Sequence, residues 1–242
     1  MQLSVVVRIA ARNEWRGAGV AGYEGWLEFL MPAPRAKTIL LTGFGAFPGA
    51  RSNPTEVIAR RLGALRRFAL LGVKVEARVL PVVYDKIESE LRKLLDEVKP
   101  DVVIHLGLAG RRKVVSVETR AINRVYMLRP DAARRFSATN VVVAGGGVRK
   151  SRWPGARLVK AMSAHAPVKA SIDAGDYLCN QALYLTLGLC AAPAGFIHVP
   201  KPRARKPLRE DYAANQAQPT LAAMTRAVEA AIVAMIPATP RA

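Results

Sequence analysis

Cys179 is one of only two cysteines in the 242-residue chain, and it follows the segment SIDAGDYL where a helix is expected to begin. A helix N-terminus presents free N–H groups and the positive end of the helix dipole, which lower a thiol pKa and favour the nucleophilic thiolate. The same groups can stabilise an oxyanion during acyl transfer. The alternative is a buried structural cysteine, the common fate of this residue type. Position alone leaves both roles open.

His198 is the histidine best placed to act as a catalytic base. It ends the apolar run GFIHV just before Pro200, at the sheet edge where sites form. The other two histidines have structural interpretations, since His105 lies within an apolar run and His165 ends an expected helix. Cys190, within LGLCAAPAG, is expected to be a buried core cysteine.

A Cys–His pair needs a third group that orients the imidazole, and the candidates are Glu118, Asp173 and Asp176. Glu118 lies in VSVETRAIN, an expected strand of mostly apolar or small residues, where a carboxylate needs a partner. The alternative to a catalytic role is a salt bridge to Arg120, two residues on and therefore on the same face of the strand.

No motif in the sequence indicates a metal or a nucleotide cofactor, and we expect neither. The spacings CxxC, HxxxH and HExxH do not occur. The turn GFGAF at 43–47 lacks the pattern GxGxxG, because position 48 is proline. Its two aromatic residues, Phe44 and Phe47, are either core residues or walls for a small apolar ring.

Hydrophobic patterning predicts the elements that position these residues. Strands are expected at 37–44, 73–82, 101–108, 114–122, 168–174 and 194–199. Helices are expected at 54–67, 84–98, 154–165, 178–191 and 219–236, and 123–152 is expected to be irregular. The alternation predicts an α/β fold, a three-layer α/β/α sandwich with a mostly parallel central sheet. Sites in such folds lie beyond the carboxyl ends of strands, which selects 43–49, 107–110, 175–179 and 198–201.

The first 36 residues have no regular hydrophobic period, and we expect a loosely ordered extension there. Met31, shortly before the first strand, is an alternative natural start. Residues 37–242 are expected to form a single domain.

Composition narrows the class of protein. With 51% hydrophobic residues and no apolar run of about 18 residues, the chain is predicted to be globular without a membrane span. Two cysteines make no disulfide framework and suit a reducing cytoplasm. The net charge of +19 would suit a nucleic acid, but the arginines are spread along the chain without interleaved aromatics. Nucleic-acid binding is therefore not expected as the main function.

Taken in order from Lys37 to Lys201, these segments resemble the type I pyroglutamyl peptidases, also called pyrrolidone-carboxylate peptidases. ILLTGFGAF followed by Asn53-Pro54 is similar to the family's GFxPF…NP, and HLGLAGRR to its GQAGGR. VETRAIN is similar to PERVAIN, SIDAGDYLCNQALY to SxxAGxxxCNxxxY, and AGFIHVP to the family's histidine strand. VLPVVYDK also resembles a family segment. The resemblance implies a pyrrolidone carboxyl peptidase-like, phosphorylase/hydrolase-like fold.

The resemblance also implies a mechanism: Cys179 as the nucleophile, His198 as the base and Glu118 as the orienting acid. The implied activity is a cytoplasmic cysteine peptidase that removes N-terminal pyroglutamate from peptides. The family often forms dimers or tetramers, so a homo-oligomer is expected.

Substrate-binding positions follow from the same resemblance. Phe44 and Phe47 match the two aromatics that enclose the pyrrolidone ring, and Tyr177 stands where another aromatic is usual. Asn53 belongs to the NP motif, and Leu108 occupies the position of a family glutamine.

Several residues depart from the family pattern. Arg129 matches the family's oxyanion-assisting arginine only after a one-residue shift within the divergent segment 124–131. Gln181 replaces a histidine, and Asp176 is expected to raise a nearby thiol pKa. Because Leu108 lacks an amide that could hydrogen-bond the lactam and segment 124–131 is divergent, a related cysteine hydrolase with an altered substrate is one alternative. Another, from a different class, is a catalytically silent basic binding module that keeps the fold, although the joint presence of Cys179, His198 and Glu118 argues against it.

Overall fold

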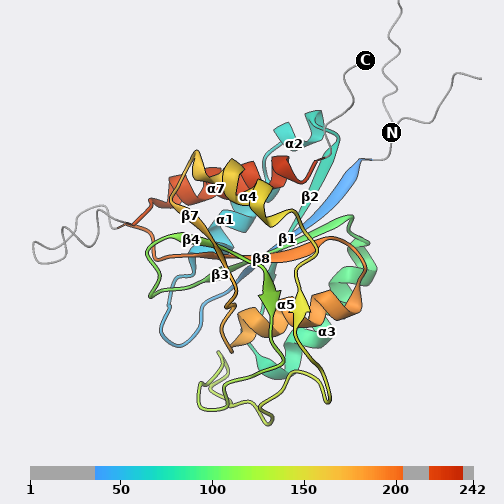
Figure 1. Cartoon of the computed structure of the whole chain (residues 1–242), viewed down its shortest axis with the longest axis vertical. Coiled ribbons are helices and arrows are strands. Elements are labelled where there is room, and N and C mark those ends of the chain that lie inside the picture. The colour runs from blue at the N-terminus through green and yellow to red at the C-terminus, as the bar shows by residue number, and fades with distance from the viewer. Residues whose placement is uncertain (1–35, 204–217, 237–242) are drawn as a thin grey trace, which may run out of the picture. The chain divides into compact units, whose positions relative to one another are not determined.

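A six-stranded sheet forms the centre of the part of the chain that the computed structural model describes, residues 36–203 and 218–236 (Figure 1). Its strands lie in the order β2-β1-β3-β8-β4-β7. Their bounds are β1 Lys37–Phe44, β2 Val73–Leu80, β3 Val102–Leu108, β4 Val115–Glu118, β7 Val168–Ser171 and β8 Ala194–Val199. Neighbouring strands are parallel except β4 and β8, which pair antiparallel. The mostly parallel sheet confirms the predicted fold class.

Helices cover both faces of this sheet. Their bounds are α1 Pro54–Gly63, α2 Arg67–Leu70, α3 Tyr84–Val98, α4 Gly155–Ser163, α5 Leu178–Leu189 and α7 Leu221–Ala234. Figure 1 shows α1, α4 and α7 on one face and α3 and α5 on the other. This is the three-layer α/β/α sandwich that the alternating pattern predicts.

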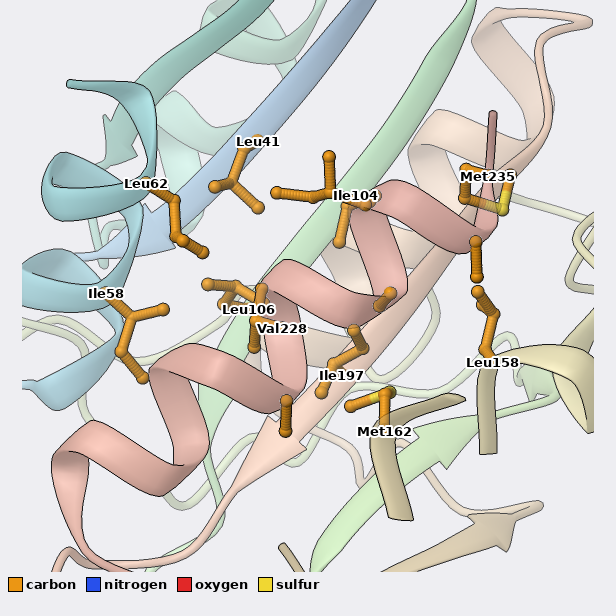
Figure 2. Close-up of a cluster of buried hydrophobic side chains, with 14 of the residues drawn as sticks. Leu41, Ile58, Leu62, Ile104, Leu106, Leu158, Met162, Ile197, Val228 and Met235 are labelled. Atoms are coloured by element: carbon orange, nitrogen blue, oxygen red, sulfur yellow. The ribbon is translucent and has the colours of Figure 1, made fainter. Parts of the chain in front are cut away.

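The larger hydrophobic core lies between the sheet and α1, α4 and α7 (Figure 2). Residues alternate between the two faces along each strand, so Leu41 points into this core while Leu40 packs on the α3–α5 side. Side chains labelled in Figure 2 come from the sheet and from all three helices: Leu41, Ile104, Leu106, Ile197, Ile58, Leu62, Leu158, Met162 and Val228. This packing holds the strand ends that carry the candidate site.

Two predicted strands end three or more residues earlier than expected. The strand expected at 114–122 is interrupted at Thr119, whose N–H and hydroxyl both donate to Ser171 O. Beyond it, β5 Arg120–Ala121 leaves the sheet and pairs with β6 Arg149–Lys150. The strand expected at 168–174 ends at Ser171 because a turn follows, in which Gly175 has a φ of 80°.

The helix expected at 54–67 begins as predicted and ends early. The Asn53 side chain caps α1 by accepting from Thr55 N at 3.1 Å, and Pro54 takes the first helical position. The helix ends at Gly63, which packs so tightly on β2 that a Cβ there would meet Ala77 Cβ. The short helix α2 then buries Phe68.

The expected N-terminal extension, residues 1–36, lies outside the described residues except for Ala36. From Ala36 on, the described residues form one unit. Within them, no helix combines the length and the apolar character that crossing a membrane requires.

Candidate active site

A pocket of about 560 Å³ lies where the carboxyl ends of β1, β3 and β8 meet the N-terminus of α5. This is the sheet edge at which sites form in α/β folds. The pocket is lined by every site residue expected from the sequence except Glu118: Cys179, His198, Phe44, Phe47, Tyr177, Leu108, Asn53 and Arg129. Glu118 is buried behind His198. The structure thus brings together residues from five separate segments.

Cys179 is the second residue of α5 and is half-buried at the pocket wall. Strand β3 passes directly beneath its sulfur. A Cβ placed on Gly107 would lie 2.8 Å from Cys179 Sγ and 2.5 Å from the Phe196 ring. Such contacts are too close for a real Cβ atom. A residue larger than glycine at position 107 would therefore displace the Cys179 sulfur or the Phe196 ring.

The pKa of Cys179 is raised, not lowered. Burial and the nearby Glu118 carboxylate raise the pKa of this thiol to about 12, against the opposing effects of Arg129, Arg112 and its own backbone N–H. The prediction that the helix N-terminus would favour a thiolate is therefore wrong for the resting protein, because desolvation dominates. The carboxylate that contributes most to this raised pKa is Glu118, while Asp176, for which the same effect was expected, lies 3.6 Å from the guanidinium of Arg124. Thiolate formation thus requires a base that accepts the proton.

His198 is positioned by Glu118, with 2.8 Å between Nδ1 and the carboxylate oxygen Oε1. Both side chains are buried. Burial raises the pKa of Glu118. The hydrogen bond and charge of His198 lower it, as do hydrogen bonds from Ser171 and Arg112, and together these effects outweigh burial, so the net shift of the pKa is downward. An ionised carboxylate can only accept, so Nδ1 carries the proton and Nε2 is left with its lone pair.

Arg112 is a member of this cluster that the sequence analysis missed. It donates to Glu118 Oε1 at 2.5 Å and to Asp173 O at 2.5 Å, so it ties the carboxylate to the loop before α5. The alternative partner, Arg120, instead donates to Ile172 O. Nothing local in Gly-Arg-Arg shows which arginine turns inward, and the only available signal was the alignment with the last arginine of GQAGGR.

The other two candidate acids do not orient the imidazole. Asp173 Oδ1 accepts from Gly175 N at 2.9 Å and so shapes the turn before α5. Asp176 faces Arg124. Among the described residues, the carboxylate bonded to His198 is that of Glu118.

Aromatic side chains form one wall of the pocket. Phe47 and Tyr177 lie 6.0 Å apart between ring centroids, and Tyr177 also meets Tyr84 edge-on at 5.7 Å. The Tyr177 hydroxyl donates to Pro130 O, which fixes the ring. Phe44 is only 3% exposed and packs near Phe196, so most of its surface belongs to the core. The support that Tyr84 gives to Tyr177 was not anticipated, since the sequence analysis identified Tyr84 only as the start of an expected helix.

The remaining expected residues have definite places. Asn53 Nδ2 donates to Gly45 O at 3.0 Å, so this side chain joins the 45–53 loop to the start of α1. The Arg129 guanidinium lies over the Tyr177 ring, 5.2 Å from its centroid. Leu108 presents an apolar surface at the end of β3.

His105 and Cys190 were both predicted to have structural roles in the core. His105 is buried and hydrogen-bonded to the hydroxyls of Thr42 and Thr186, which confirms a core role. Burial lowers its pKa to about 3. Cys190 is half-buried and packs against the core cluster on the α3–α5 side, so it is less buried than predicted. In the described part of the chain, no group of three or more His, Cys, Asp or Glu side chains is placed to hold a metal ion.

Comparison with known proteins identifies the family. A family model described as pyroglutamyl peptidase matches residues 37–238. The chain belongs to the pyroglutamyl peptidase family. The pyrrolidone-carboxylate peptidase of Pyrococcus furiosus is 37% identical over 169 residues, which are 67% of this chain and 80% of that protein. That of Chromobacterium violaceum is 37% identical over 166 residues, 68% of this chain and 78% of that protein.

Solved structures of the same family are similar to this peptidase. A mutant pyrrolidone carboxyl peptidase from P. furiosus has a TM-score of 0.72 and 33% identity, covering 81% of this chain and 97% of that one. The Thermococcus litoralis enzyme has a TM-score of 0.71 and 30% identity, covering 82% of this chain and 92% of that one. These findings confirm the family resemblance, the fold and the prediction of a pyroglutamyl-peptidase-type hydrolase.

Proposed function

We propose that this peptidase removes N-terminal pyroglutamate from peptides with Cys179 as nucleophile, His198 as base and acid, and Glu118 as the orienting carboxylate. The observation that carries the proposal is the 2.8 Å contact between Glu118 and His198 beside a pocket that Cys179 also lines. A thiol and an oriented imidazole that line the same pocket are the groups that nucleophilic catalysis requires.

The reaction begins with a proton transfer. His198 Nε2 takes the Cys179 proton, and the sulfur forms a bond to the carbonyl carbon of the pyroglutamyl residue. The imidazolium then gives its proton to the departing nitrogen as the C–N bond breaks, leaving a thioester. Water adds to the thioester with His198 again as base, and pyroglutamic acid leaves as the thiol is restored. The buried charge of Glu118 stabilises the imidazolium in each step.

Charge that develops on the carbonyl oxygen needs donors nearby. The first N–H groups of α5, including that of Cys179, have no intrahelical acceptors and lie beside the sulfur. Arg129 adds a positive charge at the same wall of the pocket. We assign the oxyanion to these groups.

The lactam ring fits the aromatic wall. Phe47 and Tyr177 offer flat apolar surfaces, Phe44 closes the inner end, and Leu108 and Asn53 lie on the β3 and α1 sides. A small, uncharged ring is the ligand such a wall favours.

The direct test is release of aminomethylcoumarin from pyroglutamyl-aminomethylcoumarin under reducing conditions. The wild type should turn over, Cys179→Ala should not, and Cys190→Ala should remain active because that thiol lies outside the pocket. Iodoacetamide should abolish activity with alkylation of Cys179, mapped by mass spectrometry. Turnover by Cys179→Ala at the wild-type rate would remove the proposal.

Leu108 supports a second candidate, a cysteine hydrolase of the same mechanism whose preferred acyl group differs from pyroglutamate. A leucine cannot donate to a lactam oxygen as an amide does. Under this alternative, iodoacetamide would still modify Cys179 and a library of N-acyl peptides would be cleaved faster than the pyroglutamyl substrate.

A cytoplasmic location and a homo-oligomer complete the proposal. Both cysteines are free, and a thiol nucleophile must be kept reduced to work. Cell fractionation under native expression tests the first, and sedimentation of the purified chain tests the second. Recovery in an oxidising compartment, or a monomer at all concentrations, would contradict them.

A further inference from the structure

The pocket carries an excess of positive charge that the proposed triad does not use. Five of its lining residues are arginine or lysine, and two are aspartate. Arg112 is engaged with Glu118, Arg124 faces Asp176, and Arg129 lies over Tyr177. Within the described residues, the side chains of Arg111 and Lys201 form no ion pair and no hydrogen bond, and both are exposed at the pocket rim.

Arg111 and Lys201 come from two strands that lie side by side. β3 and β8 are paired in register up to Leu108 and Val199, and Ala109 N extends the ladder by donating to Val199 O at 2.9 Å. The two loops that leave these strands remain in contact, because a Cβ on Gly110 would lie 3.2 Å from Lys201 Cε. The lysine stem therefore runs along the loop that carries Arg111.

Arg111 and Lys201 follow the carboxyl ends of β3 and β8, and β8 is the strand that carries His198. Lys201 follows His198 by three residues, and His198 protonates the departing nitrogen in the proposed reaction. The aromatic wall for the lactam is built mainly from Phe47 and Tyr177, on other segments. The residue after pyroglutamate would consequently lie against Arg111 and Lys201.

We propose that Arg111 and Lys201 form a carboxylate-binding subsite for the residue after pyroglutamate, so that the enzyme favours substrates whose leaving residue carries a carboxylate. The inference rests on the proposed function and extends it to the leaving side. In a pyroglutamyl dipeptide, the terminal carboxylate is separated from the scissile nitrogen by one carbon. An acidic side chain on the same residue offers the same chemical group from a different direction.

Arg111 supports this assignment because it departs from the family motif. In the alignment of HLGLAGRR with GQAGGR, Arg111 stands where the motif has its third glycine, the one directly before its arginine. Glycine offers no charge to a leaving residue, whereas a guanidinium offers paired N–H donors that match a carboxylate. The preference is therefore expected of this chain and not of the motif.

The experiment compares kcat/KM for matched substrates that differ by one carboxylate. Pyroglutamyl-alanine against its amide tests the terminal carboxylate, and pyroglutamyl-glutamate amide against pyroglutamyl-glutamine amide tests the side chain. We expect the charged member of at least one pair to be favoured about threefold to tenfold, mostly through a lower KM, as exposed ion pairs allow. The ratio should fall as sodium chloride is raised.

Variants show whether these two cations are responsible. In Arg111→Gln/Lys201→Gln, the ratio within the responding pair should fall towards one. Lys113→Gln removes an exposed charge of the same loop that does not line the pocket, and it should keep the wild-type ratio. A ratio of one for both pairs in the wild type, or an unchanged ratio in the double variant, would overturn the proposal.

Pyroglutamyl-aminomethylcoumarin has a leaving group without a carboxylate. It therefore tests the proposed peptidase activity independently of the carboxylate-binding subsite. If the enzyme releases aminomethylcoumarin but shows no preference within either pair, the subsite is refuted and the proposed function stands. If neither the coumarin substrate nor any pyroglutamyl peptide is cleaved, both are refuted.

Discussion

Glu118 reaches His198 across a diagonal of the sheet. In the antiparallel pairing of β4 and β8, Glu118 lies opposite Phe196, and His198 is the next residue of β8 on the same face. The 2.8 Å contact follows from this register. A slip of one residue would turn one of the two side chains to the other face of the sheet and separate them.

Replacing Glu118 with glutamine tests that contact. Glu118→Gln keeps the shape but loses the charge that stabilises an imidazolium, so kcat should fall about 10²- to 10⁴-fold. Steady-state kinetics on the coumarin substrate measure it, with Glu88→Gln, exposed on α3, as the matched control. Equal kcat values for Glu118→Gln and the wild type would refute the orienting role.

Arg112 should act as a positioning residue through Glu118. Arg112→Gln removes two bonds of 2.5 Å, and since hydrogen bonds to charged groups contribute about 1.5–3 kcal/mol, kcat should fall about tenfold to hundredfold. Arg112 also lowers the Glu118 pKa, so its loss raises that pKa and should move the acid limb of the kcat/KM profile to higher pH.

Two further variants check the assignment of Arg112. Arg112→Lys keeps a positive charge, so the acid limb of its kcat/KM profile should lie between those of the wild type and Arg112→Gln. Arg61→Gln, which changes an exposed arginine on α1, should leave the pH profile unchanged. A lower kcat with an unmoved acid limb would mean that Arg112 acts only on the loop before α5.

Gly107→Ala should disrupt both the thiol and the core. The new methyl group would meet Cys179 Sγ at 2.8 Å and the Phe196 ring at 2.5 Å, so we expect a loss of about 1–3 kcal/mol in unfolding free energy and a large loss of activity. Gly147→Ala is the matched control, because a Cβ there meets nothing within 4 Å. Urea unfolding and the coumarin assay measure both, and wild-type behaviour of Gly107→Ala would show that β3 does not pass beneath the sulfur.

Leu108→Gln should improve recognition of pyroglutamate. An amide at the end of β3 could donate to the lactam, and a neutral hydrogen bond of about 0.5–1.5 kcal/mol corresponds to a two- to tenfold gain in kcat/KM. Leu108→Met has a similar volume and no such donor, so it should show no gain. The same kcat/KM for both variants would mean that Leu108 does not face the lactam.

His105 should make the fold sensitive to acid. Its pKa is about 3 in the folded protein and 6.5 in the reference state, so the unfolded chain binds the proton more readily. Its contribution to stability is complete above pH 6.5 and is lost as the pH falls towards 3, by up to about 1.4 kcal/mol per pH unit. His105→Gln should therefore unfold with a weaker dependence on pH between 6.5 and 5. His165→Gln, at an exposed histidine, should keep the wild-type slope in the same urea titrations.

The elements, and the edge of the sheet on which the candidate site lies, could be predicted from residue patterns along the chain. The helix at 84–98 and the strand at 194–199 have the predicted bounds, because their hydrophobic periods match the helix and strand repeats. Parallel strands place their carboxyl ends together, so Cys179 and His198 could be assigned to one edge of the sheet from the sequence alone. These features depend on residues that are near one another in the chain.

The contacts between the residues of the candidate site could not be predicted in this way, because they depend on the three-dimensional fold. The antiparallel direction of β4 sets Glu118 against His198, although 80 residues separate them. Glu118 pairs with Arg112 and not with Arg120 because of the course of the loop after β3. The raised pKa of Cys179 reverses the local expectation, because burial by distant segments outweighs the N-terminus of its own helix. The direction of a strand, the course of a loop and the desolvation of a side chain all depend on contacts between residues far apart in the chain. Local sequence patterns therefore do not predict them.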